Sequence, residues 1–175
     1  MKLPVNYLGA LGYLTEIDFF KKTKKNSEHF LTPKALFRYS PEHMRKEIDE
    51  TARLDHSDIF SLDRLNKFNN FESGINTTLG FDYKINKSDK EFDFSIGQII
   101  NFKENKDMPS SSSLDEKLSD IVGTSNYKFN DKVSVNYNFA FDQNYNEVNY
   151  NEFGSSFNAN PFKFNFNYLL ESKHI

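Results

Sequence analysis

Residues 132–143, KVSVNYNFAFDQ, alternate apolar and polar side chains with a period of two. One parity holds aliphatic and aromatic residues: Val133, Val135, Tyr137, Phe139 and Phe141. The other parity holds small or polar residues: Ser134, Asn136, Asn138, Ala140 and Asp142. Successive side chains of a β-strand point to opposite faces of the sheet. The stretch therefore predicts a strand with one aromatic face and one polar face.

The same alternation recurs along most of the chain. It is strong in residues 71–85, 91–103 and 162–170, where Phe, Tyr, Ile and Leu dominate one parity. Weaker copies complete a set of about eight predicted strands, near residues 5–19, 29–39, 71–85, 91–103, 119–129, 132–143, 148–158 and 162–170. Neighbouring strands of this kind predict an all-β fold, an antiparallel up-and-down meander of about eight long strands.

The predicted connections alternate in length. Residues 21–28, 86–90, 130–131 and 158–161 are short connections, and residues 144–147 are intermediate. Residues 41–70 and 104–118 are long loops. The short connections contain Asn and Asp, which tolerate the backbone angles of tight turns. One edge of the sheet should therefore carry tight turns and the other edge loops.

Composition narrows the function classes. The 175 residues suffice for one domain or for a slice of a larger one. With 22 Lys and Arg against 25 Asp and Glu, the chain lacks the basic field that holds nucleic acid, so we predict no nucleic-acid partner. The absence of Cys excludes a disulfide scaffold and thiolate zinc sites. No apolar stretch approaches the ~20 residues of a membrane helix.

The aromatic content is high for so polar a chain. There are 19 Phe and 9 Tyr, although the mean hydropathy is −0.70. A soluble barrel would enclose the aromatic face, as in a small binding module for an apolar ligand; an outer-membrane barrel would turn that face to lipid. The strand lengths, the alternating loops and a polar parity that is hydrophilic throughout favour the outer-membrane barrel. The soluble binding module is the alternative.

Few stretches suggest chemistry. The run KKTKK at residues 21–25 could contact anionic lipid or phosphate, but we favour a solvated turn. Residues 41–50 contain His43 among carboxylates but lack the two-His spacing of a zinc motif, and residues 110–113, SSSS, have no glycine elbow. Both are interpreted as loops. We therefore predict no catalytic, cofactor-binding or metal-ligating residues, no cofactor and no enzyme activity.

Two sets of polar residues have a predicted structural or lining role. Asp63 and Arg64 are interpreted as a salt bridge that fixes a long loop back onto the barrel, with a surface pair as the alternative. The polar parity could line a path for a charged cargo, or equally could hydrate a lumen or contact a plug. Its members are Glu72, Asp82, Lys84, Asp93, Lys103, Asn136, Asn138 and Asp142.

Four stretches carry a family resemblance when they are taken together. They are LTPKALFRYSP at residues 31–41, FSLDRL at 60–65 followed by FESGI at 71–75, FSIGQIINF at 94–102, and FNY at 166–168. In order and spacing they resemble strands of the LptD family, the lipopolysaccharide-assembly proteins also called organic solvent tolerance proteins. The resemblance runs from about residue 30 to the end.

The resemblance implies a transmembrane outer-membrane β-barrel in a Gram-negative bacterium. It implies that residues 1–175 are part of an LptD-type barrel domain, within the translocon that inserts lipopolysaccharide into the outer leaflet. The implied partners are an LptE-type lipoprotein plug, the periplasmic Lpt bridge, lipopolysaccharide and membrane lipid. The family also has a signal peptide, a periplasmic jellyroll, many more strands and a terminal aromatic strand. We therefore expect an internal barrel segment of a longer chain, in the cell outer membrane.

Overall fold

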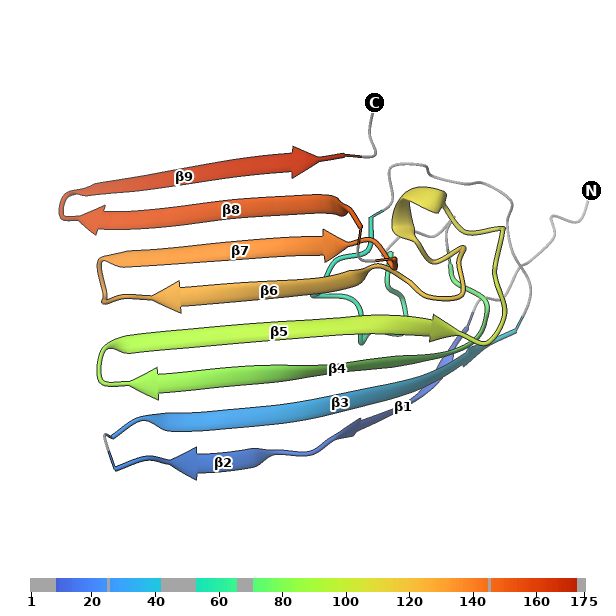
Figure 1. Cartoon of the computed structure of the whole chain (residues 1–175), viewed down its shortest axis with the longest axis horizontal. Coiled ribbons are helices and arrows are strands. Elements are labelled where there is room, and N and C mark those ends of the chain that lie inside the picture. The colour runs from blue at the N-terminus through green and yellow to red at the C-terminus, as the bar shows by residue number, and fades with distance from the viewer. Residues whose placement is uncertain (1–8, 25, 42–52, 66–70, 145, 173–175) are drawn as a thin grey trace, which may run out of the picture.

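The computed structural model describes residues 9–24, 26–41, 53–65, 71–144 and 146–172 (Figure 1). Nine strands in this part of the chain form one sheet in which every neighbouring pair is antiparallel. They are β1 (Leu11–Glu16), β2 (Phe19–Lys22), β3 (Glu28–Ser40), β4 (Gly74–Lys87), β5 (Lys90–Asn101), β6 (Ile121–Lys128), β7 (Val133–Phe141), β8 (Val148–Ala159) and β9 (Phe162–Glu171), with one short 3-10 helix, η2 (Ser110–Ser112). The all-β, up-and-down meander is confirmed. No helix in the described ranges has the length and apolar character needed to cross a membrane.

β1 and β2 together form a single span along β3. Their pairings with β3 keep one register, from Leu11 opposite Tyr39 to Lys22 opposite Glu28. The interruption falls opposite Pro33, which accepts a hydrogen bond from Ile17 N at 3.2 Å but has no N–H to return. The nine strands therefore make eight spans, in agreement with the predicted number.

The two faces of the sheet differ as the alternation predicts. Aromatic side chains of neighbouring strands contact one another on one face; the ring centroids of Phe81 and Phe94 lie 6.0 Å apart, and those of Phe94 and Phe139 lie 6.5 Å apart. This aromatic face remains exposed, with Phe164 61% and Leu79 48% accessible. A soluble binding module would enclose such a face, whereas a barrel in lipid presents it outward.

The connections divide the sheet into two ends (Figure 1). The turns β2–β3, β4–β5, β6–β7 and β8–β9 lie at one end, and the connections β3–β4, β5–β6 and β7–β8 lie at the other. In the β6–β7 turn, Asn130 Oδ1 accepts hydrogen bonds from Lys132 N at 2.8 Å and Val133 N at 3.0 Å. These bonds explain why Asn suits that turn.

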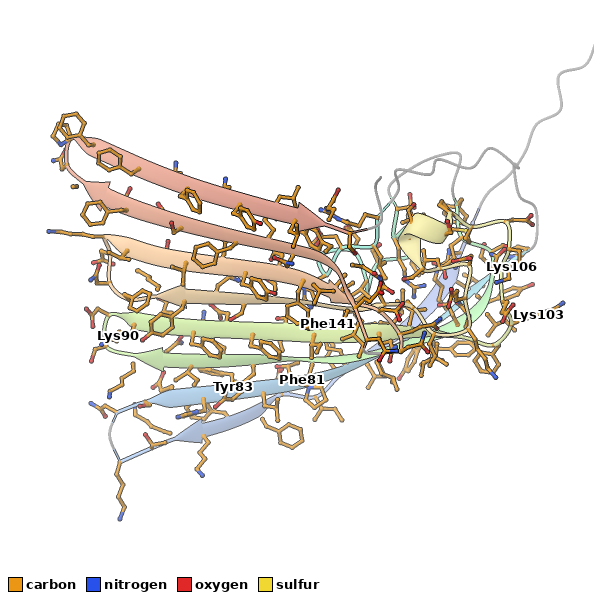
Figure 2. The ribbon with its side chains drawn as sticks, turned by 45° about the horizontal axis from the view of Figure 1, so that its top comes forward. Phe81, Tyr83, Lys90, Lys103, Lys106 and Phe141 are labelled. Atoms are coloured by element: carbon orange, nitrogen blue, oxygen red, sulfur yellow. The ribbon has the colours of Figure 1, made fainter. Side chains whose placement is uncertain are left out.

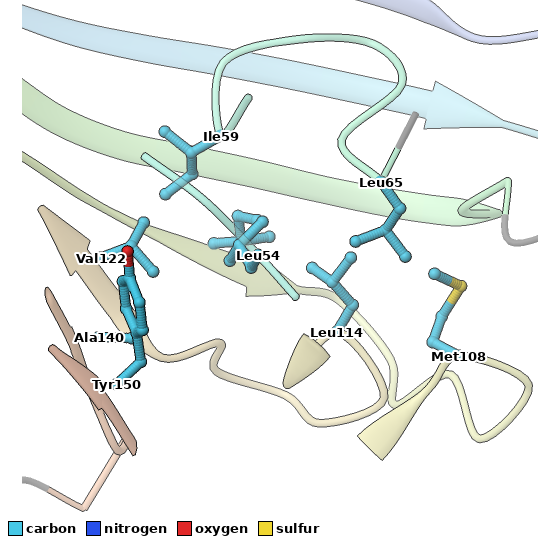
Figure 3. Close-up of a cluster of buried hydrophobic side chains, with 9 residues drawn as sticks. Leu54, Ile59, Leu65, Met108, Leu114, Val122, Ala140 and Tyr150 are labelled. Carbon is cyan, nitrogen blue, oxygen red and sulfur yellow. The ribbon is translucent and has the colours of Figure 1, made fainter. Parts of the chain in front are cut away.

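The buried core lies at the loop end, on the face opposite the aromatic one (Figure 3). We call this second face the inner face. Two loops and four strands contribute to the core: Leu54, Ile59, Leu65, Met108, Leu114, Ile99, Val122, Ala140 and Tyr150. The prediction that the polar parity is hydrophilic throughout is therefore wrong at the loop end, because Ile99, Val122 and Ala140 belong to that parity and pack beneath the loops. It is also wrong at the turn end of β2 and β3, where Phe20 and Phe30 share the parity of Lys84 and their ring centroids lie 5.0 Å apart.

Candidate functional site: the inner face and its inserted loop

Residues 53–65, within the β3–β4 connection, fold back over the inner face. We call them the inserted loop. Its contacts reach from β8 and β9, through Arg53, to β1, where a Cβ on Gly12 would collide with the side chain of Leu62. The loop thus crosses the whole width of the described sheet. This arrangement closes the loop half of the inner face and leaves the turn half open.

Arg53 holds one end of the inserted loop. Its guanidinium carbon lies 3.8 Å from the ring centroid of Tyr150, and its Nη1 donates a hydrogen bond of 2.5 Å to Glu171 Oε1. A guanidinium over an aromatic face is attracted by the ring quadrupole, more strongly where water is excluded. The contact joins the start of the loop to β8 and β9.

Arg64 holds the other end through five hydrogen bonds. Nη1 donates to both Glu72 carboxylate oxygens at 2.8 Å, and Nη2 donates to Asn76 Oδ1 at 3.0 Å and Thr78 Oγ1 at 2.7 Å. Nε donates to Ile59 O at 3.0 Å. Burial lowers the pKa of Arg64, and Glu72 opposes that shift. Five donors matched to five acceptors suit a guanidinium that is removed from water.

Arg38 brings a second buried cation to the same carboxylate. Its Nε donates to Leu62 O at 2.9 Å and its Nη2 to Glu72 O at 2.6 Å. Its Nη1 lies 3.9 Å from Glu72 Oε2 and has no hydrogen-bond partner within the described structure. Glu72 is therefore the acid shared by two buried guanidinium groups. Because isolated buried charges are costly, removal of this shared carboxylate should strongly destabilise the cluster.

Glycines on the inner face make room for the inserted loop. A Cβ at Gly97 on β5 would lie 3.2 Å from Ile59 Cδ1 and 3.5 Å from the Phe60 ring. A Cβ at Gly80 on β4 would lie 3.0 Å from Phe60. At Gly80 an added Cβ would collide first with the β5 backbone, at Ile96 O, so that glycine also allows β4 and β5 to approach closely. At Gly97 the nearest atom belongs to the loop, so a larger side chain there would push the loop away from the sheet.

Replacing Gly97 with valine should loosen the inserted loop, since overpacking of this kind costs about 1 to 3 kcal/mol. Trypsin digestion of the protein in lipid vesicles should then cut after Arg53 or Arg64 faster than in the wild type. Ile59→Val removes the Cδ1 atom that valine would meet, so the double variant should lose less protection than the two single variants added together. Wild-type cleavage rates for G97V would exclude docking of the loop on Gly97.

The open turn half of the inner face carries bonded polar side chains. Lys34 Nζ lies 3.1 Å from Glu16 Oε1 and 2.7 Å from Asp82 Oδ2. Asn138 accepts from Thr124 Oγ1 at 2.7 Å and donates to Glu152 Oε2 at 3.1 Å. A hollow of about 310 Å³ lies over β5, β6 and β7. Its polar lining includes Asp93, Asn126, Lys128, Ser134, Asn136 and Asn138. This surface can hydrogen-bond to a polar partner or to ordered water.

The predicted lining residues divide into three groups. Asp82, Lys84, Asp93, Asn136 and Asn138 share the inner face by register. Glu72 is buried beneath the inserted loop, 3% exposed. Lys103 and Asp142 lie beyond the ends of β5 and β7, so they do not line the strand wall. Lys103 instead lines a cleft of about 840 Å³ at the loop end, beside Tyr39 and Phe102.

The structure also gives the surroundings of the Asp63–Arg64 pair and of the serine run at residues 110–113. The Asp63–Arg64 hypothesis named the right cation, but its carboxylate partner is Glu72, which could not be paired from adjacency in sequence. Ser112 Oγ donates to Pro109 O at 2.6 Å and Ser113 Oγ accepts from Asp120 N at 2.8 Å, so these serines hold their own loop. His43 lies outside the described residues. The described ranges contain no cluster of three or more potential metal ligands.

Sequence reasoning missed Arg38 and Arg53 as anchors and the apolar half of the inner face. One signal was present: Ile99 and Ile100 are adjacent apolar residues, which breaks the alternation and indicates that the inner face is apolar at this position too. Arg38 offered a second signal. It lies between Phe37 and Tyr39 of the aromatic face, so its side chain belongs to the inner face of β3 and places a cation there. The contact between Arg53 and Tyr150 joins residues 97 positions apart and left no local signal.

Comparison with known families identifies a match over nearly the whole chain. The family described as LptD, LPS transport system D, matches residues 10–175. A search of curated proteins found no match. The matched region includes every described strand, both long loops, and the Arg64–Glu72 cluster.

Proposed function

This chain belongs to the LptD family, and on that premise we propose that its strands form part of the wall of the translocon that inserts lipopolysaccharide into the outer leaflet. Members of the family act in lipopolysaccharide transport and assembly at the outer membrane of Gram-negative bacteria, and the family is not known for enzyme activity. The observation that carries the proposal is the family match over a sheet with an exposed aromatic face and a polar inner face.

The two faces support a place in the barrel wall. Lipid-facing and lumen-facing residues alternate along each strand of an outer-membrane barrel, as they do here. The sheet is open: β1 and β2 form one edge and β9 the other. Unpaired backbone groups are not tolerated in hydrocarbon, so we propose that further strands of an LptD-type barrel domain pair with both edges.

The inner face supports two roles within the lumen. Tight turns of outer-membrane barrels face the periplasm and longer loops face the exterior. On that orientation, the inserted loop and the β5–β6 loop close the lumen near the outer mouth. The open turn half of the inner face then faces an LptE-type lipoprotein plug and the lipopolysaccharide that arrives from the periplasmic Lpt bridge. Its amides, hydroxyls and charges offer donors and acceptors to both.

Site-specific photo-crosslinking in growing cells tests this proposal. A photoreactive residue at Asn136, on the open inner half, should crosslink to the lipoprotein plug and, during active transport, to lipopolysaccharide. The photoreactive residue placed instead at Tyr137, the next position along β7 and on the aromatic face, should crosslink neither to the plug nor to lipopolysaccharide in the lumen. Both variants must support growth, so that the comparison is made on working protein.

Two results would contradict the proposal. If Asn136 and a second inner position, Asn165 on β9, give no plug or lipopolysaccharide adduct in cells that transport lipopolysaccharide, this wall does not face the lumen path. If Tyr137 captures the plug and Asn136 does not, the two faces are assigned the wrong way round.

A further inference from the structure

The tight-turn end of the sheet is basic, although the chain as a whole has a formal charge of −3. We call the described residues of these four turns, 21–24, 26–28, 87–91, 128–132 and 160–163, the turn rim. The turn rim carries four carboxylates, Glu28, Asp89, Glu91 and Asp131, against eight lysines: Lys21, Lys22, Lys24, Lys87, Lys90, Lys128, Lys132 and Lys163. Its formal charge is therefore +4, and each of the four turns contributes at least one lysine.

Most of these lysines are not neutralised within the described structure. Lys22 pairs with Glu28 at 2.9 Å and Lys128 pairs with Asp131 at 2.8 Å. The other six have no ion pair among the described residues, and all six are exposed. Uncompensated cations that are repeated along one edge attract an extended anionic surface more than a single small anion.

Three of the free lysines lie on the aromatic parity, where lipid would be. Lys21 has the parity of Phe19, and Lys87 and Lys90 lie directly opposite each other at the end of the β4–β5 hairpin. Like charges directly opposite in a sheet repel, and a shared anion relieves that repulsion. Figure 2 shows Lys90 at the turn end of the sheet and Lys103 and Lys106 at the loop end.

Aromatic residues lie next to these lysines on the same face. Phe92 follows Lys90 by two positions, and Tyr83 donates or accepts a 2.8 Å hydrogen bond with His29 Nδ1 beside Lys21. Amphipathic aromatic rings and lysines with flexible stems gather where hydrocarbon meets lipid headgroups. The aromatic band therefore sets the lysines at headgroup level.

We propose that the turn rim binds the headgroups of anionic phospholipid, in the membrane leaflet on the tight-turn side. The inference rests on the proposed function, in that the strands must span the outer membrane with their tight turns toward the periplasm. A phospholipid surface fits better than free phosphate, because the lysines are spread over four turns instead of converging on one pocket. The lysines at residues 21–25, interpreted from sequence as a solvated turn, then form one part of a longer basic edge.

Spin-labelled lipids can measure this preference on the full-length protein. The protein is reconstituted in phosphatidylcholine vesicles with a trace of spin-labelled phosphatidylglycerol or spin-labelled phosphatidylcholine, and the motionally restricted fraction of each label is compared. We expect phosphatidylglycerol to be favoured by about fivefold, the effect of one lysine near an anionic headgroup. The preference should decline at high salt, because exposed charges are screened.

Matched variants locate the preference. K87Q/K90Q removes two charges from the turn rim, and should lower the preference at least twofold. K103Q/K106Q removes two charges from the loop end and should leave it unchanged. An unchanged preference in K87Q/K90Q, or an equal loss in both variants, would overturn the proposal.

The same spectra separate this proposal from the function on which it rests. A restricted component without preference for phosphatidylglycerol would overturn the basic rim alone, because the protein would still be embedded in lipid. The absence of any restricted component for either lipid would contradict a membrane-spanning wall, and with it both proposals.

Discussion

Replacing Glu72 with glutamine should lower the free energy of unfolding by about 3 to 5 kcal/mol, the range found when one partner of a buried ion pair is removed. The substitution keeps the shape of the side chain but removes the carboxylate that Arg38 and Arg64, both fully buried, share. Arg64→Gln should cost less, because Glu72 then still faces Arg38. The order of the two effects follows from the charge count of the cluster.

The measurement is the fraction of folded protein in lipid vesicles across a guanidinium titration, read from the difference in gel mobility between heated and unheated samples. Glu28→Gln is the control, because Glu28 belongs to an exposed pair with Lys22 and such pairs contribute about 0 to 1 kcal/mol. The double variant R64Q/E72Q should cost less than the sum of its parts. A titration of E72Q that superimposes on the wild type would show that the cluster does not hold the inserted loop.

Replacing Phe81 with arginine should destabilise the protein in a bilayer by about 2 to 4 kcal/mol, the cost of a cation on the lipid face near the midplane. Phe81 lies in the middle of β4, on the aromatic face, and the residue is 37% exposed. In hydrocarbon a guanidinium has no water and no carboxylate within reach on that face, so the bilayer must deform or the side chain must bend toward headgroups.

Ser95→Arg is the matched control for this second substitution. Ser95 lies on β5 opposite Asp82, on the inner face, so the new guanidinium would meet a carboxylate and water. The same titration in vesicles should show little loss for S95R. Equal losses for F81R and S95R would mean that the two faces do not differ in environment, and would contradict a lipid-facing aromatic surface.

Much of the fold was predictable because its cause is local. Alternation along residues 132–143 is a property of neighbouring side chains, and β7 follows it from Val133 to Phe141. The division into a turn end and a loop end followed from connection lengths alone. The break between β1 and β2 was harder to foresee, since it results from Pro33 on the facing strand and not from the residues at the break.

The site was less predictable because its contacts join distant residues. Arg64 could be recognised as a structural cation within its loop. Its hydrogen-bond acceptors on Glu72, Asn76 and Thr78 depend on the position at which the inserted loop packs against the sheet. The apolar positions Ile99, Val122 and Ala140 looked like isolated exceptions on a polar parity. They form one core only because two loops cover them together.

The sequence by itself determined that this chain forms long strands with one aromatic and one polar face, and that tight turns and long loops alternate. It also showed that four short sequence motifs occur in the order found in the LptD family. These properties depend on the spacing of residues within short stretches of the chain, so they can be recognised without knowing which stretches pack together. Only the tertiary structure decided that residues 53–65 cross the inner face, that one carboxylate serves two buried guanidinium groups, and that four separate turns make one basic edge. Those features arise when strands far apart in the chain are placed side by side, and that placement depends on pairing register and loop docking, which no short stretch of sequence contains.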